Sequence, residues 1–334
     1  MTRASGVGSL PGEGSADYAE AVRVVLGELA PPDGVPHLPE LPGRGAAASL
    51  TGRALAVTAT LGADLQPAGW RLTDASGVDH RRARSLLAQD LDAVEEQAQG
   101  LTGAFKIQVA GPWTLAATVE KPRGDKVVSD HGARRDLAQA LAEGVREHVA
   151  DVRRRVPGAD RLVVQVDEPV LTAVLEARVP TASGFGRHRA VHPPEVSEAL
   201  GWVLDAVTSA GGEPWVHSCA AGTPLGLLRA AGTRGLSVDL GVLVVADLDQ
   251  LAEAWEAGET VALGVVPGVD PAERPTAVQV TERVQRVLDL LGIDLGEASP
   301  RLVLTPACGL AGASPGWVRD ALRTCREAAV NLSG

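Results

Sequence analysis

Short apolar runs alternate with longer amphipathic stretches along the whole chain, and this alternation limits the fold more than any other feature of the sequence. Eight runs have the composition of strands: Ala4–Gly8, Val35–Leu38, Phe105–Val109, Arg161–Val166, Pro214–His217, Leu236–Asp239, Val261–Val265 and Leu302–Thr305. Helical spacing of apolar residues marks Ala16–Leu29, Arg81–Gln99, Arg134–Arg155, Glu195–Ala210, Pro271–Leu291 and Pro315–Val330. Eight strands that alternate with helices are what a closed parallel barrel requires. We therefore predict an α/β fold, a single (β/α)₈ TIM barrel that forms one domain over residues 1–334.

An open, doubly wound sheet uses the same alternation and is the alternative fold. No glycine-rich phosphate-binding fingerprint follows a strand, which disfavours a nucleotide-binding version of that sheet. Hydrophobic residues make up 45% of the chain but aromatic residues only 3%, so the core must be built mainly from Val, Leu and Ala. Branched aliphatic side chains are typical of a barrel interior.

The charge of the chain excludes several classes of partner. A formal net charge of −11 argues against nucleic acid and against anionic membrane surfaces. The sequence has neither the apolar core of a signal peptide at its start nor a run of about 20 apolar residues that could span a bilayer. Its three cysteines, Cys219, Cys308 and Cys325, are too few and too far apart for a disulfide framework. These features indicate a cytoplasmic protein.

Residues that can carry chemistry gather where the predicted strands end. The segments concerned are Gly8–Pro11, Pro39–Pro42, Gly111–Thr114, Asp167–Pro169, His217–Cys219, Asp239 and Thr305–Gly309. Two long connections, Glu120–Ala133 and Val179–Pro194, also follow strands. In a parallel barrel all these segments lie on one face, where active sites are built from loops of several strands. The bland interpretation of each long connection is a solvated surface loop.

Three of these residues suit a metal ion. His217 and Cys219 are two positions apart, so they face the same side of an extended backbone. Cys308 comes from a distant strand end that the barrel brings back in space, and an imidazole with two thiolates is a known catalytic zinc arrangement. Asp239, at the next strand end, offers a further carboxylate ligand. A His-x-Cys pair packed in the core is the alternative. Such a zinc site favours binding an incoming thiol as thiolate over generating hydroxide.

Together these segments resemble a known family. Gly8-Ser9-Leu10-Pro11, Val109–Thr114, Val164–Pro169, His217-Ser218-Cys219 and Pro306–Leu310 are similar, in order and spacing, to the C-terminal catalytic barrel of cobalamin-independent methionine synthase. The resemblance covers essentially the whole chain. It implies the short, single-barrel form, without the family's separate N-terminal barrel, and a fold among the uroporphyrinogen decarboxylase-like barrels.

The resemblance implies a role for each matched residue. His217, Cys219 and Cys308 are implied zinc ligands, with Asp239 in the place of a family glutamate that is one methylene longer. Asp167, a catalytic-site residue, and more weakly Glu40 are implied acceptors for the amino group of homocysteine, and Ser9 holds its carboxylate. Glu168 is assigned to the substrate with its neighbour, and Trp113 offers a flat face to a pterin ring. The alternatives are a structural carboxylate pair at 167–168 and a packing role for the tryptophan.

One departure from the family concerns the methyl donor. The folate-using enzymes carry a histidine after the seventh strand, where this chain reads Gly264–Asp270 without one. An amine leaves poorly unless it is protonated, so the loss matters most for methyltetrahydrofolate. A methylated corrinoid protein needs no such proton. Asp270, His188 or His192 are candidate substitutes for the missing acid.

The expected function is therefore zinc-dependent methylation of homocysteine to methionine, with methylfolate or a methylcorrinoid protein as donor. A decarboxylase-type lyase on the same barrel is one alternative, but it requires an arginine cluster near the first strand end that the sequence lacks. A non-catalytic zinc-binding homologue is the other, and it is favoured by the missing histidine and by the aspartate at position 239.

Overall fold

A parallel sheet of eight strands forms the centre of the molecule. The computed structural model describes residues 1–333. Its strands run β2-β1-β10-β9-β8-β7-β6-β5, and each hydrogen-bonded pair is parallel. Their bounds are β1 (Arg3–Ser5), β2 (Gly34–Val35), β5 (Gly103–Ala110), β6 (Ala159–Asp167), β7 (Glu213–Ser218), β8 (Gly235–Asp239), β9 (Thr260–Val266) and β10 (Leu302–Pro306). All eight predicted strands are present, and the predicted (β/α)₈ barrel is confirmed.

The two ends of this sheet meet just beyond β2. His37 and Lys106 form an isolated parallel bridge. The amide of Leu38 donates to the carbonyl of Lys106 at 2.8 Å, and the amide of Lys106 donates to the carbonyl of Pro36 at 2.8 Å. The first two strands are shorter than predicted, and single bridges such as Ser9–Glu40 continue them. Because the barrel closes here, all strand ends face one mouth.

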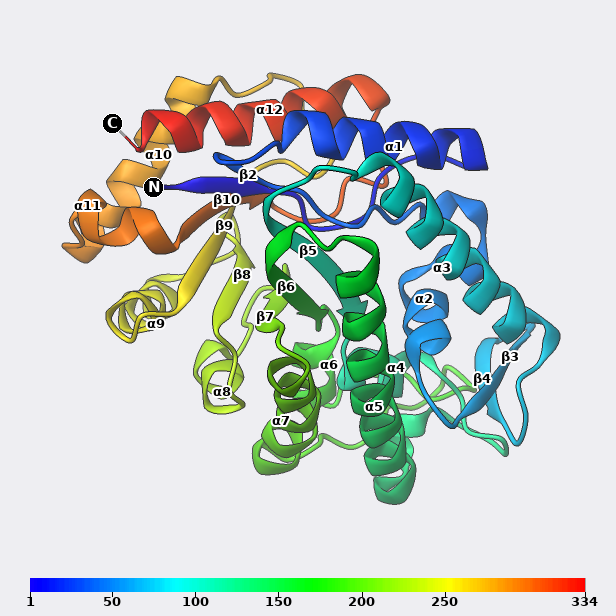
Figure 1. Cartoon of the computed structure of the whole chain (residues 1–334). Helices are drawn as coiled ribbons and strands as arrows, with labels where there is room; N and C mark the ends of the chain where they lie inside the picture. The colour runs from blue at the N-terminus through cyan, green and yellow to red at the C-terminus, as the bar shows by residue number, and fades with distance from the viewer. Residues whose placement is uncertain (334) are drawn as a thin grey trace.

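The helices surround the barrel (Figure 1). The six predicted helices correspond to α1 (Ser15–Glu28), α3 (Val78–Gln97), α5 (His131–Arg155), α7 (Pro193–Ser209), α10 (Ala277–Leu291) and α12 (Pro315–Asn331). The first and last of them, α1 and α12, contact each other, so the two ends of the chain are joined. Helix α10 begins six residues later than predicted because Thr276 caps it by accepting from the amide of Gln279.

Several short elements were not predicted. A hairpin, β3 (Gly62–Gln66) and β4 (Gly69–Thr73), is inserted between β2 and α3. The other additions are α2 (Leu50–Val57), α4 (Pro112–Thr118), α6 (Leu171–Leu175), α8 (Leu225–Ala230), α9 (Val245–Glu256), α11 (Leu295–Ala298) and 3₁₀ turns at Pro42–Arg44, Ala46–Ala48, Val127–Ser129 and Ser299–Arg301. Most of these segments are too short to give a helical period in the sequence.

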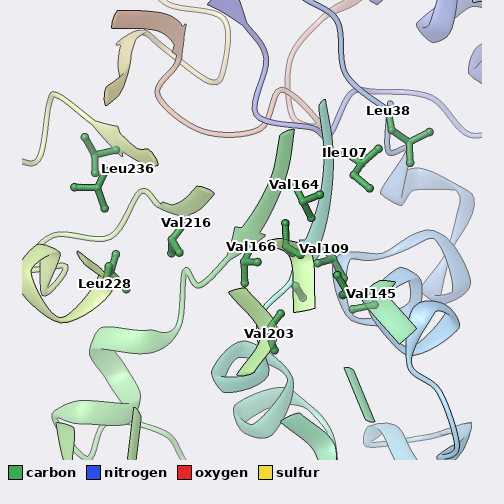
Figure 2. Packing of buried hydrophobic residues seen from close by; sticks show 14 of the residues in the cluster. Leu38, Ile107, Val109, Val145, Val164, Val166, Val203, Val216, Leu228 and Leu236 are labelled. Atoms are coloured by element: carbon green, nitrogen blue, oxygen red, sulfur yellow. The ribbon is translucent and has the colours of Figure 1, made fainter. Parts of the chain in front are cut away.

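Alternate strand residues serve two different environments. Figure 2 shows strand residues such as Ile107, Val109, Val164 and Val166 in one packed cluster with helix residues such as Val203. The residues between them point into the barrel, as the period of two requires. At one level this interior is apolar, where Val163, Trp215, Ala262 and Val303 form a cluster of their own. Nearer the mouth the interior becomes polar, and the candidate site lies there.

No helix formed by residues 1–333 is both long enough and apolar enough to cross a bilayer.

Candidate functional site

The imidazole of His217 and the thiols of Cys219 and Cys308 meet at the mouth of the barrel. His217 lies near the end of β7, Cys219 directly follows that strand, and Cys308 follows β10. One ligand atom from each lies within 4.8 Å of the others. The two sulfur atoms are 2.8 Å apart, and both cysteines are free. The predicted convergence of these three residues is therefore present in the fold.

The donor atoms of this cluster fit a metal ion. The Nδ1 atom of His217 faces the carbonyl oxygen of Ser237 at 3.1 Å and its hydroxyl at 3.0 Å. Its Nε2 atom is buried and has no hydrogen-bond partner within residues 1–333. A buried, unpartnered nitrogen is costly unless a ligand completes it, and metal-binding histidines typically anchor their other nitrogen in this way.

The two thiols are hydrogen-bonded to each other. A hydrogen bond from Cys219 and the proximity of His217 lower the pKa of Cys308 to about 4, while burial acts in the opposite direction. The same hydrogen bond, followed by burial, raises the pKa of Cys219. The direction of the Cys308 shift favours a thiolate next to the unpartnered imidazole nitrogen, and a thiolate is the form that binds a soft metal ion.

Asp239 lies at the end of β8 but outside this cluster. Its Oδ1 atom accepts a hydrogen bond from the amide of Gly241 at 2.7 Å. The metal-binding group that the described residues form consists of His217, Cys219 and Cys308. The bond to Gly241 uses one oxygen of this carboxylate, and the group as it stands does not include Asp239.

A cavity of about 170 Å³ opens above the three ligands. A cavity of this size suits a small molecule. Its lining includes Ser9, Glu40, Asp167, His217, Cys219 and Cys308. A larger hollow of about 390 Å³ lies between α1 and α12, but its charged residues Glu13, Asp17 and Arg319 are exposed.

The two carboxylates in the cavity are each held by a glutamine. Asp167, the last residue of β6, accepts from Nε2 of Gln165 at 2.7 Å. Glu40 accepts from Nε2 of Gln108 at 3.0 Å and pairs with Nε of Arg53 at 3.3 Å. Burial raises the pKa of Asp167 to about 7, against the opposing charge of His217. A cationic group that entered the cavity would restore its ionised form.

Ser9 follows β1 and forms a bridge with Glu40, so it lies beside that carboxylate in the lining of the cavity. Its amide neighbour Leu10 donates to the carbonyl of Glu40, and its own carbonyl accepts from Leu310 at 2.8 Å. A Cβ atom on Gly309 would come within 2.0 Å of the Ser9 hydroxyl. The absence of a side chain at position 309 therefore leaves the space that Ser9 occupies.

Glu168 and Trp113 lie in the wall behind the cavity, not in its lining. Both oxygens of Glu168 are used: Oε1 accepts from the amide of Trp113 at 2.9 Å, and Oε2 accepts from the amide and hydroxyl of Thr114, each at 2.7 Å. Burial raises the pKa of Glu168 to about 7. The Trp113 indole is 1% exposed and donates to the carbonyl of Val196 at 3.0 Å. Neither residue is among those that line the cavity, so their contact with substrate stays a prediction.

The three candidate substitutes for the missing histidine lie elsewhere. Asp270 accepts from the amide and hydroxyl of Ser314, which lower its pKa and hold it as a carboxylate at the start of α12. His188 contacts Asp125 at 3.1 Å, and His192 is exposed at the start of α7. None of the three lines the cavity.

The two long loops are connected to each other. Oδ1 of Asp125, in the first loop, accepts from the amide of Ala182 at 2.8 Å and contacts Nε2 of His188 at 3.1 Å, both in the second. A bridge between Pro180 and Arg187 makes the second loop a small hairpin, with Phe185 fully exposed at its tip. Both segments come after a strand, as predicted, but a short helix, α4 or α6, lies between the strand and the loop.

A polar layer beneath the cavity was missed in the sequence. Lys106, Gln108 and Gln165 are buried in the barrel and hydrogen-bonded to one another. The signal that could have found them is the alternation of Phe105, Ile107 and Val109 with polar residues in one buried strand, since the polar set must then face the interior.

Comparisons with known proteins agree with this geometry. The profile of the family described as "Cobalamin-independent synthase, Catalytic domain" matches residues 94–331. A B12-independent methionine synthase from Shewanella sp. W3-18-1, solved in complex with selenomethionine, is similar over 100% of this chain and 98% of that one, with 15% identity and a TM-score of 0.64. An apo β-glucosidase structure overlaps 76% of this chain and 80% of its own, at 12% identity and a TM-score of 0.37, too low to carry an argument.

A search of curated protein sequences found no match. The structural likeness establishes the fold, and the family match covers more than half of the sequence. The residues that match the family include Asp167, the three potential metal ligands and β10, the last strand of the barrel. The chain therefore belongs to the family of the cobalamin-independent synthase catalytic domain.

Proposed function

We propose that this chain is a zinc-dependent methyltransferase that methylates L-homocysteine to methionine, acting as one catalytic barrel domain over residues 1–334. The observation that carries the proposal is the meeting of His217, Cys219 and Cys308 on a cavity that two carboxylates also line. Membership of the synthase family and the fold likeness to a methionine synthase solved with selenomethionine support it.

The three clustered residues would hold the zinc ion, with Asp239 as a candidate fourth ligand. A zinc ion bound by these residues would keep a coordinated thiol deprotonated at neutral pH. A free thiol, with a pKa of about 8.5, is mostly protonated at that pH. The unpartnered Nε2 of His217 and the thiolate character of Cys308 support this assignment.

The remaining cavity residues orient the acceptor. With its sulfur toward the cluster, the ammonium group of homocysteine would donate to Asp167 and Glu40, which are acceptors for a charge-assisted hydrogen bond. Ser9 and neighbouring amides would hold the carboxylate. Because Asp167 is destabilised by burial when charged, binding an ammonium group there is favourable. These contacts would place the sulfur for in-line attack on a methyl group.

In the reaction a bond forms between sulfur and the methyl carbon, and the bond from the methyl carbon to the donor breaks. The donor departs with the electron pair, and the thiol proton passes to solvent. A folate amine needs a proton to leave, whereas a corrinoid does not. Asp270, His188 and His192 lie outside the cavity, so the expectation of little turnover with methyltetrahydrofolate rests on the missing histidine after the seventh strand.

The test is a donor comparison with zinc-loaded protein. Methionine formation from L-homocysteine is measured with methylcobalamin and with methyltetrahydrofolate, using Cys308→Ser as the inactive control. We expect turnover with methylcobalamin and little with the folate. Methionine from neither donor, together with zinc binding and no affinity for homocysteine, would identify a non-catalytic zinc-binding homologue instead.

A further inference from the structure

One buried cation lies directly beneath the proposed amino-acid pocket. Lys106 is on β5, and its side chain is 0% exposed. Its Nζ atom donates to the carbonyl of Val7 at 2.8 Å and to Oε1 of Gln165 at 3.0 Å, and lies 3.5 Å from Oε1 of Gln108. The ammonium group thus uses three acceptors from three separate segments of the chain.

These contacts determine which way the two glutamine amides face. An amide has an acceptor end and a donor end, so an ammonium group at the oxygen turns the NH₂ group away from itself. The NH₂ group of Gln165 then donates to Asp167 at 2.7 Å, and that of Gln108 donates to Glu40 at 3.0 Å. Each NH₂ group also donates to a backbone carbonyl, that of Gln165 to Val7 at 3.0 Å and that of Gln108 to Leu38 at 2.6 Å. The cation at the oxygen and the carbonyl at the nitrogen together fix each amide.

The third acceptor links the same ammonium group to the segment that carries Ser9. The carbonyl of Val7 accepts both from Lys106 and from Nε2 of Gln165 at 3.0 Å. Gly8 then packs so tightly on Gln108 that a Cβ atom there would lie 2.8 Å from the amide carbon. Each group assigned to the amino-acid end of the acceptor is therefore one or two contacts from Lys106.

Packing alone does not account for a lysine at this position. A methionine side chain would fill similar space without the cost of desolvating a charge. The interior one level down is in fact apolar. Burial lowers the pKa of Lys106 to about 8, and the nearby charges of Asp167 and Glu40 oppose that change. The cation is retained where two carboxylates need a fixed arrangement.

We propose that Lys106 is a positioning residue, whose ammonium group fixes the two carboxylates, Glu40 and Asp167, in the orientation that receives the amino group of the acceptor. This inference rests on the proposed function, because it concerns the same pocket. Lys106 touches neither the acceptor nor the metal ligands; it acts through the two glutamines. Asp167 depends on it more than Glu40 does, since Glu40 also pairs with Arg53.

The test compares two thiols that differ only in the amino group. Calorimetry on the zinc-loaded full chain measures the affinity for L-homocysteine and for 4-sulfanylbutanoate, its analogue without the amino group. We expect Lys106→Met to weaken homocysteine binding by about tenfold to a hundredfold, the loss typical of a charged hydrogen bond. Binding of 4-sulfanylbutanoate and the zinc content should stay at the wild-type level. Lys121→Met, in a surface loop, is the matched control and should change neither affinity.

Each outcome has a distinct meaning. Equal losses for both thiols, or no loss for either, would overturn the positioning role. If Lys106→Met does not fold, Gln165→Met keeps the test open, because it cuts the link to Asp167 while retaining the cation, and it should show the same selective loss. A wild-type protein that binds neither thiol refutes the proposed function itself, and the role of Lys106 falls with it.

Discussion

The sulfur atoms of Cys219 and Cys308 lie 2.8 Å apart, although 89 positions separate the two residues in the sequence. Two strands, β8 and β9, lie between β7 and β10 in the sheet, and the curvature of the barrel brings the ends of β7 and β10 to a common mouth. The buried Nε2 of His217 completes the group. A ligand set assembled from distant strand ends makes metal binding depend on the whole fold.

The first prediction concerns the metal. Cys308→Ser should lower the affinity for zinc by at least about a hundredfold, because loss of a direct ligand exceeds the tenfold to hundredfold effect of its supporting contacts. The measurement is zinc content after dialysis against a competing chelator. Cys325→Ala is the matched control, since Cys325 is buried in α12 away from the cluster. Equal zinc content in both variants would contradict the assignment.

The second prediction concerns the fourth ligand. With Asp239 as the fourth ligand, Asp239→Ala should weaken zinc binding by about tenfold, less than loss of a thiolate does. Asp239→Glu, which restores the length of the family's residue, should bind at least as tightly as wild type. Asp249→Ala, on the exposed side of α9, serves as the control. An unchanged zinc affinity in Asp239→Ala would remove Asp239 from the ligand set.

The periodic pattern of the sequence was sufficient to predict the fold, because the periods of strands and helices are local properties of the sequence. It was also sufficient for the meeting of His217 with Cys308, since parallel strands deliver their ends to one face. The β3–β4 hairpin was missed although Trp70 and Leu72 alternate with polar residues before Gly77. Its strands are only five residues long, and no strong turn-forming pair of residues joins them.

The direction of individual side chains was harder to predict than their strand. Glu168 and Asp167 are neighbours, so they point to opposite sides of β6, and only one of them can face the cavity. The sequence pattern did not reveal that the short helix α4 would present two amides and a hydroxyl to Glu168. For Trp113, burial against α7 depends on how α4 and α7 pack, which no local pattern specifies.

A third prediction tests the role of Glu168 as a structural residue. Thr114→Val removes the hydroxyl that donates to Oε2 at 2.7 Å, which should lower the free energy of unfolding by about 1–3 kcal/mol. Denaturant unfolding measures this change. Thr208→Val on α7, whose hydroxyl donates within its own helix, should cost less. Affinity for homocysteine should be unaffected, and a selective loss of it would return Glu168 to the pocket.

A fourth prediction separates the two carboxylates of the cavity. Asp167→Asn should weaken homocysteine binding by about tenfold to a hundredfold, because a charge-assisted hydrogen bond to the amino group is lost. Glu40→Gln should have the smaller effect, since Arg53 already neutralises part of that charge. Calorimetry with homocysteine and 4-sulfanylbutanoate measures both. A similar loss for the analogue without the amino group would show that Asp167 acts on something else.

The last prediction concerns pH and a residue far from the cavity. His148 is buried in α5, and burial lowers its pKa from 6.5 to about 4. Between these two values the unfolded chain binds a proton at this position that the folded chain does not. His148 therefore contributes stability that is present above pH 6.5 and is lost as the pH falls toward 4, by up to about 3 kcal/mol.

Denaturant unfolding at pH 7.5 and pH 4.5 should show a smaller loss of stability for His148→Leu than for wild type. His192→Leu removes an exposed imidazole instead and should follow wild type. If His148→Leu and wild type lose equal stability over this range, the folded protein tolerates a protonated imidazole at position 148, which contradicts the prediction.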